Sequence, residues 1–277
     1  MKQTKVLSGK TTLKSFVLAA TIICGTGLLT GCEEKSEPGI PDGGQVPSTD
    51  SWASLVNETE QSASVNENTL TYGSHTYTVL GQIDTESSST GYIGTATASV
   101  QFSNIPSGYK EFEAVYKGLL GKSLQGTAAM IPMAIEIYAR NASTGERCFK
   151  LLCNSESTVN GILRILKQRF NWSPYSGPND SYVQRYMAAA LLKGATPENA
   201  YTPSQPYTVE MAASANKPQK VTGGTDTFLY IFSKAWDGEQ RQVEIFLPNG
   251  SELYQVYNCP SVYTHCKDII GTWGGLK

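Results

Sequence analysis

The sequence is poor in the residues that most enzymes use for acid–base and nucleophilic chemistry. Its only histidines are His75 and His265, so a Ser-His-Asp triad or a Cys-His pair has few ways to form. No Gly-x-Ser-x-Gly pattern occurs. Gly121-Lys122-Ser123 mimics the end of a phosphate-binding loop, but the first glycine of that loop is replaced by Tyr116. These absences favour a protein that is not an enzyme.

Positive charge is also scarce outside the N-terminus. The chain holds 22 Lys and Arg against 24 Asp and Glu, a formal net charge of −2. Four of the lysines and none of the acids lie in residues 1–31, which leaves 18 of the 22 basic residues and all 24 acidic ones for the remainder. Such an acidic chain lacks the electrostatic footprint of a nucleic-acid-binding protein. We therefore expect no nucleic-acid partner.

Long apolar runs are absent except for Phe16–Leu29, which follows the lysines of residues 2–14. This run is shorter than the ~20 residues of a membrane span, which weighs against a transmembrane helix. A basic segment followed by a short apolar one is typical of a signal peptide. The ending Thr30-Gly31-Cys32 resembles a bacterial lipobox, whereas an ordinary secretory signal is the alternative. The prediction is a lipoprotein signal peptide over 1–31, with Cys32 carrying a palmitate-type lipid anchor to the membrane.

The residues after Cys32 predict a tether. Glu33-Glu34-Lys35-Ser36-Glu37 resembles the acidic opening of surface-exported lipoproteins in some Gram-negative bacteria. Residues 32–66 are rich in Glu, Ser, Pro and Gly and too poor in apolar residues to offset the entropy of ordering. We expect a flexible tether that holds the protein to the cell envelope, at the outer membrane or the cell surface. The inward or outward orientation stays open.

Helical patterns dominate the first half of the remaining chain. A hairpin of strands around Gly73-Ser74 and a half-exposed strand over 95–102 come first. Apolar residues then recur at helical spacing over 112–120, 124–138, 159–170 and 182–191. Pro132 is expected to kink the second helix or to begin a new one.

Strand patterns dominate the second half. The connector 194–207 contains three prolines, which exclude a continuous helix or a central strand. Period-two alternation follows over 207–213, 243–247 and 253–257, and 228–232 is apolar on both faces. The predicted fold class is α+β, with a helical half packed on a four-stranded antiparallel meander and an extra N-terminal hairpin. We expect a single domain over 67–277.

The connector also carries a family resemblance. The motifs Asn179-Asp180-Ser181-Tyr182, Gly194-Ala195-Thr196-Pro197-Glu198-Asn199 and Tyr201-Thr202-Pro203-Ser204-Gln205-Pro206-Tyr207 resemble an uncharacterised bacterial family, a domain of unknown function found in many anaerobic gut bacteria. The resemblance covers about residues 105–270. It implies one domain that spans both halves, and it implies no activity, cofactor or catalytic residue.

Four cysteines lie beyond the proposed lipid anchor, and an exported protein commonly meets an oxidising compartment. The disulfide candidates are Cys148, Cys153, Cys259 and Cys266. Local pairing, crossed pairing and free thiols stay open, and a Cys148–Cys153 bridge requires a break in any helix between them. Zinc ligation by Cys259, His265 and Cys266 is an alternative, but their spacing does not match common zinc sites. We expect no metal and no cofactor.

Aromatic residues cluster around the connector and favour a binding role. Such side chains stack on sugars or peptides, although core packing is the alternative. The candidates for a ligand groove are Trp172, Tyr175, Tyr182, Tyr186, Tyr201 and Tyr207. The predicted function is a lipid-anchored envelope protein that binds or assembles with a partner, such as a glycan or a peptide, in an oligomeric state left open.

The alternative function is an envelope hydrolase that cleaves glycans through paired carboxylates. Its candidate residues are Asp180, Glu198, Asp226 and Asp237. All four lie in turns or at cap positions of the predicted elements, where acidic residues are common for structural reasons.

Overall fold

The structure is a computed structural model of the 277-residue chain. It describes residues 56–83, 85, 95–170, 184–271 and 276. By its internal contacts the chain divides into residues 1–41 and 42–277, and all the described residues belong to the second unit. The predicted signal peptide, Cys32, Trp172, Tyr175, Asp180 and Tyr182 lie outside the described residues.

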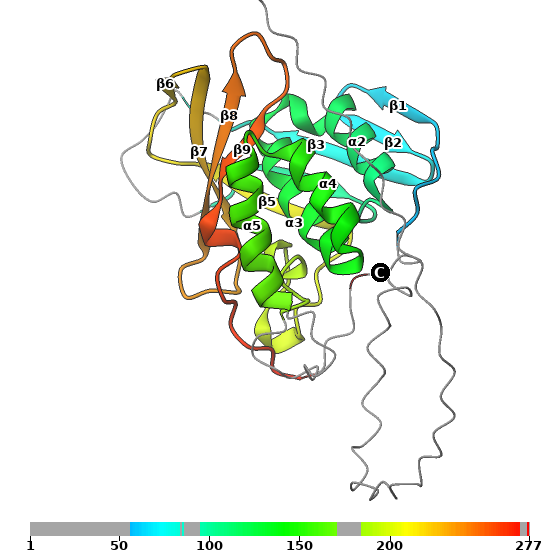
Figure 1. The fold of residues 1–277 in the computed structure, drawn as a ribbon. Coiled ribbons are helices and arrows are strands. Elements are labelled where there is room, and N and C mark those ends of the chain that lie inside the picture. Colours follow the sequence, from blue (N-terminus) through cyan, green and yellow to red (C-terminus); the bar gives the residue numbers. More distant parts are fainter. Residues whose placement is uncertain (1–55, 84, 86–94, 171–183, 272–275, 277) are drawn as a thin grey trace, which may run out of the picture. The chain divides into compact units, whose positions relative to one another are not determined.

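The strands of the described residues form one antiparallel sheet, at whose centre β5 and β7 pair through Met211 and Ile231. Its order is β1-β2-β3-β4-β5-β7-β8-β9, with β6 paired to β7 (Figure 1). The strands are β1 (Ala63–Asn66), β2 (Thr69–Tyr72), β3 (His75–Gly81), β4 (Ala98–Phe102), β5 (Tyr207–Ala213), β6 (Gln219–Val221), β7 (Gly224–Phe232), β8 (Gln240–Pro248) and β9 (Gln255–Asn258).

The α+β class is confirmed, but the predicted arrangement of the strands is wrong. The N-terminal hairpin is not a separate addition, because β4 pairs with β5 and joins both strand groups into one sheet, with Val100 opposite Val209. Alternation in a sequence predicts strands but not their distant partners. β1 lies within the range 32–66 predicted as tether, so the folded domain begins before residue 67.

Four α-helices of the described residues cover the sheet (Figure 1). They are α2 (Tyr109–Gly118), α3 (Leu124–Arg140), α4 (Ala142–Leu152) and α5 (Glu156–Phe170), and short 3-10 helices are η2 (Leu120–Lys122), η3 (Ala189–Leu191), η4 (Pro197–Asn199) and η5 (Pro260–Val262). None of these α-helices is both long and apolar enough to span a bilayer. The predicted helix over 182–191 is wrong in its described part, where turns and η3 replace it. All the residues from 186 to 191 are apolar and buried, so the helical spacing found among them does not mark one buried face of a helix.

Helix α3 is the centre of the core. Every residue from Gln125 to Ala139 is buried, whereas the predicted stripe would bury only one face. The helix continues through Pro132, so the prediction of a new helix at Ile131 is wrong. Ser123 caps its N-terminus by accepting a hydrogen bond of 3.1 Å from the backbone N–H of Gly126.

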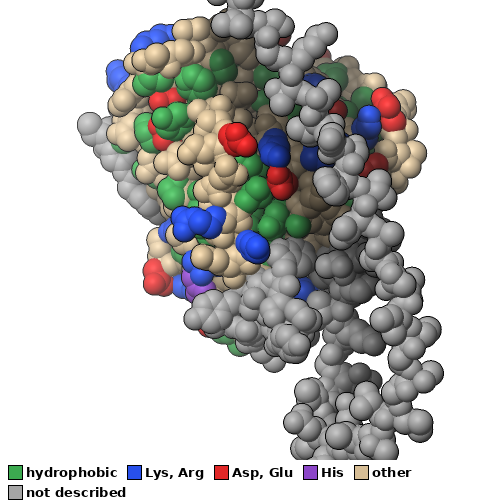
Figure 2. Space-filling view, viewed as in Figure 1, with side chains coloured by type: hydrophobic (Ala, Val, Ile, Leu, Met, Phe, Trp, Pro, Cys, Tyr) green, Lys and Arg blue, Asp and Glu red, His purple; other side chains and the backbone are tan. Residues whose placement is uncertain are grey.

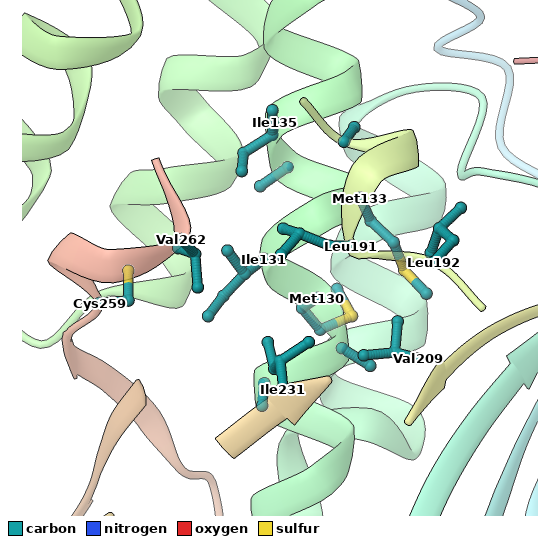
Figure 3. Close-up of a cluster of buried hydrophobic side chains, with 14 of the residues drawn as sticks. Met130, Ile131, Met133, Ile135, Leu191, Leu192, Val209, Ile231, Cys259 and Val262 are labelled. Carbon is teal, nitrogen blue, oxygen red and sulfur yellow. The ribbon is translucent and has the colours of Figure 1, made fainter. Parts of the chain in front are cut away.

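Side chains from distant parts of the chain surround α3. It contacts β4, β8 and β9 as well as α2 and α4. Figure 3 shows Cys259 and Val262 on one side of its residues Met130 and Ile131, with Leu191 on the other. The face of the sheet that packs on α3 is therefore used for the core.

We predict that Ile135→Ala lowers the free energy of unfolding by about 2–5 kcal/mol, because the side chain is fully buried and its loss leaves a cavity. Urea denaturation followed by circular dichroism measures the change. The matched control is Ile270→Ala, since Ile270 is 66% exposed and its truncation should change stability by less than about 0.5 kcal/mol. Equal effects of the two substitutions would contradict the central role of α3.

Candidate functional site

The described members of the predicted aromatic cluster are buried. Tyr186, Tyr201 and Tyr207 keep 7%, 0% and 3% of their surface. The rings of Tyr186 and Tyr201 stack with centroids 4.8 Å apart, and the Tyr201 hydroxyl donates to the backbone oxygen of Lys267 at 2.9 Å. These side chains serve packing and form no open aromatic surface. A groove here would depend on Trp172, Tyr175 and Tyr182, which lie outside the described residues.

The connector is ordered by hydrogen bonds of its own. Thr196 and Asn199 form a reciprocal capping box at η4, and the Asn199 amide also donates to the backbone oxygens of Gly194 and Thr202. Gly194 has a φ of +82°, and a Cβ added there would lie 2.2 Å from the Ser204 hydroxyl oxygen. The segment needs glycine at this point and delivers the chain into β5.

All four candidate disulfide cysteines, Cys148, Cys153, Cys259 and Cys266, are free thiols in the structure, so the predicted disulfides are not formed. Cys148 lies within α4, Cys153 follows the end of that helix, and Cys259 follows β9, where it interacts electrostatically with Cys153. Burial raises the pKa of Cys153 to about 12 and that of Cys259 well above its usual value. Thiols held neutral in this way are poor nucleophiles and poor metal ligands.

The residues of the alternative zinc site do not converge. Cys259 and Cys266 are buried, whereas His265 is exposed and pairs with Asp268 at 3.5 Å. Across the described ranges no three His, Cys, Asp or Glu side chains come together as a possible metal site.

The carboxylates predicted for hydrolysis lie in different environments. Glu198 is in the first turn of η4, where a hydrogen bond from its own backbone N–H lowers its pKa. Asp237 is fully exposed and lies 3.1 Å from the Lys267 ammonium. Asp226 differs from both, since it lies within β7 and keeps only 7% of its surface. Of these described candidates, Asp226 alone is a desolvated carboxylate.

Asp226 belongs to the face of the sheet that points away from the helices. The buried residues of β7 and β8, such as Leu229 and Val243, form the inner face. Since side chains alternate across a strand, the residues between them form a second face, here called the outer face. It consists of Asp226, Phe228, Tyr230, Phe232, Gln240, Gln242, Glu244 and Phe246.

The outer face combines aromatic, amide and acidic side chains. Phe246 lies directly opposite Asp226, and Phe228 lies opposite Glu244. Tyr257 of β9 continues this surface, because its ring centroid is 6.2 Å from that of Phe246 and the residue is 42% exposed. Figure 2, viewed from the side on which the α-helices lie in front, shows apolar and acidic side chains near one another in the region of β6–β8, at the upper left. The surface can offer rings for stacking and polar groups for hydrogen bonding.

Asp226 and Glu244 interact electrostatically. They occupy diagonal positions on neighbouring strands, a relation that places side chains roughly 7–8 Å apart. Desolvation raises the pKa of Asp226. Desolvation and the Asp226 charge raise the pKa of Glu244, while a hydrogen bond with the Asn258 side chain acts in the opposite direction. Glu244 was missed by sequence reasoning, which places it on a strand but cannot supply its neighbour across the sheet.

A second buried carboxylate shows the contrast. Glu111 of α2 is 1% exposed and accepts hydrogen bonds of 2.7 Å from the Tyr77 hydroxyl and from both the N–H and the hydroxyl of Ser107. Its carboxylate also lies 2.7 Å from Nδ1 of His75, which donates when Glu111 is ionised. By comparison, Oδ1 of Asp226 is buried with no hydrogen-bond partner among the described residues. Glu111 is therefore a satisfied structural group, and Asp226 is not.

We predict that Asp226→Asn stabilises the protein at neutral pH. A raised pKa in the folded state means that ionisation of Asp226 opposes folding, so its contribution is favourable at low pH and is lost as the pH rises above its ordinary pKa of about 4. The advantage of the variant over the wild type should grow from pH 3 to pH 7 in thermal unfolding scans.

Asp237→Asn is the control for this prediction, because its carboxylate is fully exposed and its replacement should bring no stabilisation at pH 7. An Asp226→Asn protein that is less stable than the wild type at neutral pH would contradict the prediction. It would show that the ionised Asp226 carboxylate stabilises the folded state.

Comparison with known proteins bears on the family alone. No curated protein and no solved structure matches the chain. A family model described as a domain of unknown function matches residues 104–270, which include all four α-helices and the strands that form the outer face. The expectation of an uncharacterised family over about 105–270 is confirmed in this form. The chain therefore belongs to the family Domain of unknown function (DUF6935).

Proposed function

We propose that this protein is a non-catalytic binding module of the cell envelope, anchored through a lipid on Cys32, whose outer face binds a glycan. The observation that carries the proposal is the composition of that face. Aromatic side chains alternate there with the amides Gln240 and Gln242 and with the acids Asp226 and Glu244. Rings stack on the apolar faces of sugars, and planar amide and carboxylate groups hydrogen-bond to hydroxyls.

The position of this face supports a binding role. The opposite face of the sheet is occupied by the core around α3, so ligand binding on the outer face leaves the fold undisturbed. Phe228, Tyr230 and Phe246 are partly exposed rather than buried, although aromatic side chains of this size favour burial. A sheet surface with several rings is suited to an extended chain of sugars, and a peptide is the competing ligand.

An envelope hydrolase is the second candidate, and one observation favours it. Asp226 and Glu244 lie diagonally on the same face, and both have raised pKa values. A raised pKa suits a general acid, and an inverting glycosidase holds its two carboxyl groups about 6.5–9.5 Å apart. Release of reducing ends from a bound glycan, lost in Asp226→Asn and Glu244→Gln, would favour the hydrolase over the binding module.

We predict that Tyr230→Ala and Phe246→Ala each weaken glycan binding by about 0.5–1.5 kcal/mol, the contribution typical of an aromatic stacking contact. A glycan array identifies the ligand, and isothermal titration calorimetry measures the affinities. Val65→Ala is the control, because Val65 is 52% exposed on β1, at the other end of the sheet. Unchanged affinity in both aromatic variants, or no binding of any glycan by the wild type, would refute the proposed ligand face.

We predict that Cys32→Ser moves the protein from the membrane fraction to the soluble fraction and abolishes its labelling with a palmitate analogue. Cys24→Ser is the matched control, because Cys24 lies inside the proposed signal peptide and its loss should leave the anchor intact. Protease treatment of intact cells then tests the orientation, since a surface protein is digested. Retention of the Cys32→Ser protein in the membrane would argue against the lipid anchor.

A further inference from the structure

We infer that the glycan recognised by the outer face bears a primary ammonium group, and that Asp226 and Glu244 receive this positive charge. The inference rests on the proposed function, because it names the chemical class of the ligand for the same face. Its basis is charge complementarity: the β7 and β8 positions of this face carry two carboxylates and no cationic side chain.

The charged side chains of the outer face on β7 and β8 are all acidic. Its positions on β7 and β8 include two acids and no lysine, arginine or histidine. Lys220 of the adjacent β6 strand donates to the Thr225 hydroxyl at 3.0 Å, and Thr225 lies on the opposite side of β7 from Asp226. Over the described ranges, neither Asp226 nor Glu244 forms an ion pair.

A neighbouring acid shows how the chain neutralises a carboxylate that needs no ligand. Glu210 of β5 lies on the same side of the sheet, since Met211 beside it pairs with the buried Ile231. Its carboxylate lies 2.7 Å from the Lys193 ammonium. The sheet thus supplies a cation for Glu210 and leaves Asp226 and Glu244 without one.

Asp226 is also poorly solvated for a charged group. It keeps only 7% of its surface, and its Oδ1 has no hydrogen-bond partner within the described part of the chain. A carboxylate in such a place is unfavourable unless it is paired or hydrogen-bonded. A cation held by a ligand beside the carboxylate would offset its negative charge, whereas an anionic ligand would add to the negative charge of Asp226 and Glu244.

The aromatic rings beside Asp226 and Glu244 also favour a cationic group on the ligand. Phe246 is opposite Asp226 and Phe228 is opposite Glu244, so each carboxylate has an aromatic neighbour across the strand pair. The face of an aromatic ring attracts a cation, most strongly where water is partly excluded. An ammonium group on a sugar can therefore meet a carboxylate and a ring together, while the sugar itself stacks on Tyr230 or Tyr257.

Three oligosaccharides of equal length that differ in charge test the inference: glucosamine oligomers, N-acetylglucosamine oligomers and uronic acid oligomers. Calorimetry at pH 6 should show the glucosamine oligomer binding roughly three- to tenfold more tightly than the neutral one, as expected for one ion pair with a cation–π contact. The anionic oligomer should bind most weakly.

Asp226→Asn and Glu244→Gln should each lower the ratio of the affinity for the glucosamine oligomer to the affinity for the neutral oligomer, because each variant removes a negative charge. Both substitutions keep the shape of the side chain, and thermal unfolding verifies that the variants are folded. Glu146→Gln on α4 is the matched control, because Glu146 lies away from the outer face and pairs with Lys150. It should leave the preference intact.

The outcomes separate the two proposals. Equal binding of the three oligomers, or strongest binding of the uronic acid oligomer, overturns the inference and leaves glycan binding standing. Binding of none of them, on the array or in solution, refutes the proposed glycan ligand as well. If a lysine-containing peptide binds instead and loses affinity in Asp226→Asn, the glycan class is overturned and the ligand is a basic peptide.

Discussion

The burial of α3 on every side is the constraint on which the rest of the structure depends. An α-helix normally keeps one polar face in water, but α3 has none from Gln125 to Ala139. Three polar side chains are buried in this stretch: Gln125 donates to the backbone oxygen of Gly81 at 3.1 Å, Glu136 pairs through Oε1 with Arg140 at 2.9 Å, and Thr127 is the third. Thr127 Oγ1 and Glu136 Oε2 have no hydrogen-bond partner among the described residues. Such a helix is stable only when other elements surround it, and the sheet, α2, α4 and the turns around Leu191 do so.

This arrangement decides which surfaces are available for function. The inner face of the sheet is used entirely for the core, so Leu229, Ile231 and Val243 have no exposed surface. The described tyrosines of the predicted groove, Tyr186, Tyr201 and Tyr207, are buried in the interior, and Tyr201 has no exposed surface. We therefore place the proposed binding surface on the outer face, where Phe228, Tyr230 and Phe246 are partly exposed.

The sequence predicts local elements well and their partners poorly. The helix over 159–170 and the strand over 207–213 are correct, because their periodicities depend only on neighbouring residues. The pairing of Val100 with Val209, and hence the single sheet, depends on residues far apart in the chain. The same limit applies to the site: Asp226 and Glu244 are each visible in the sequence, but only the register of β7 and β8 makes them neighbours. The disulfide prediction for the cysteines is wrong for a different reason. It rests on the chemistry of an oxidising compartment, whereas the structure holds all four as buried free thiols.

Two buried carboxylates then show how a structural acid differs from one available to a ligand. The oxygens of Glu111, a residue of α2, accept hydrogen bonds from β3 and from Ser107 in the segment before α2, so this carboxylate joins the helix to the sheet. Asp226 is buried too, but its Oδ1 accepts no hydrogen bond from the described residues. The negative charge of the neighbouring Glu244 also repels that of Asp226. The fold could remove this cost with one lysine on the outer face, as it does for Glu210. A surface that retains an uncompensated acid pair among aromatic rings carries a local instability, and a cationic ligand is the simplest means of relieving it.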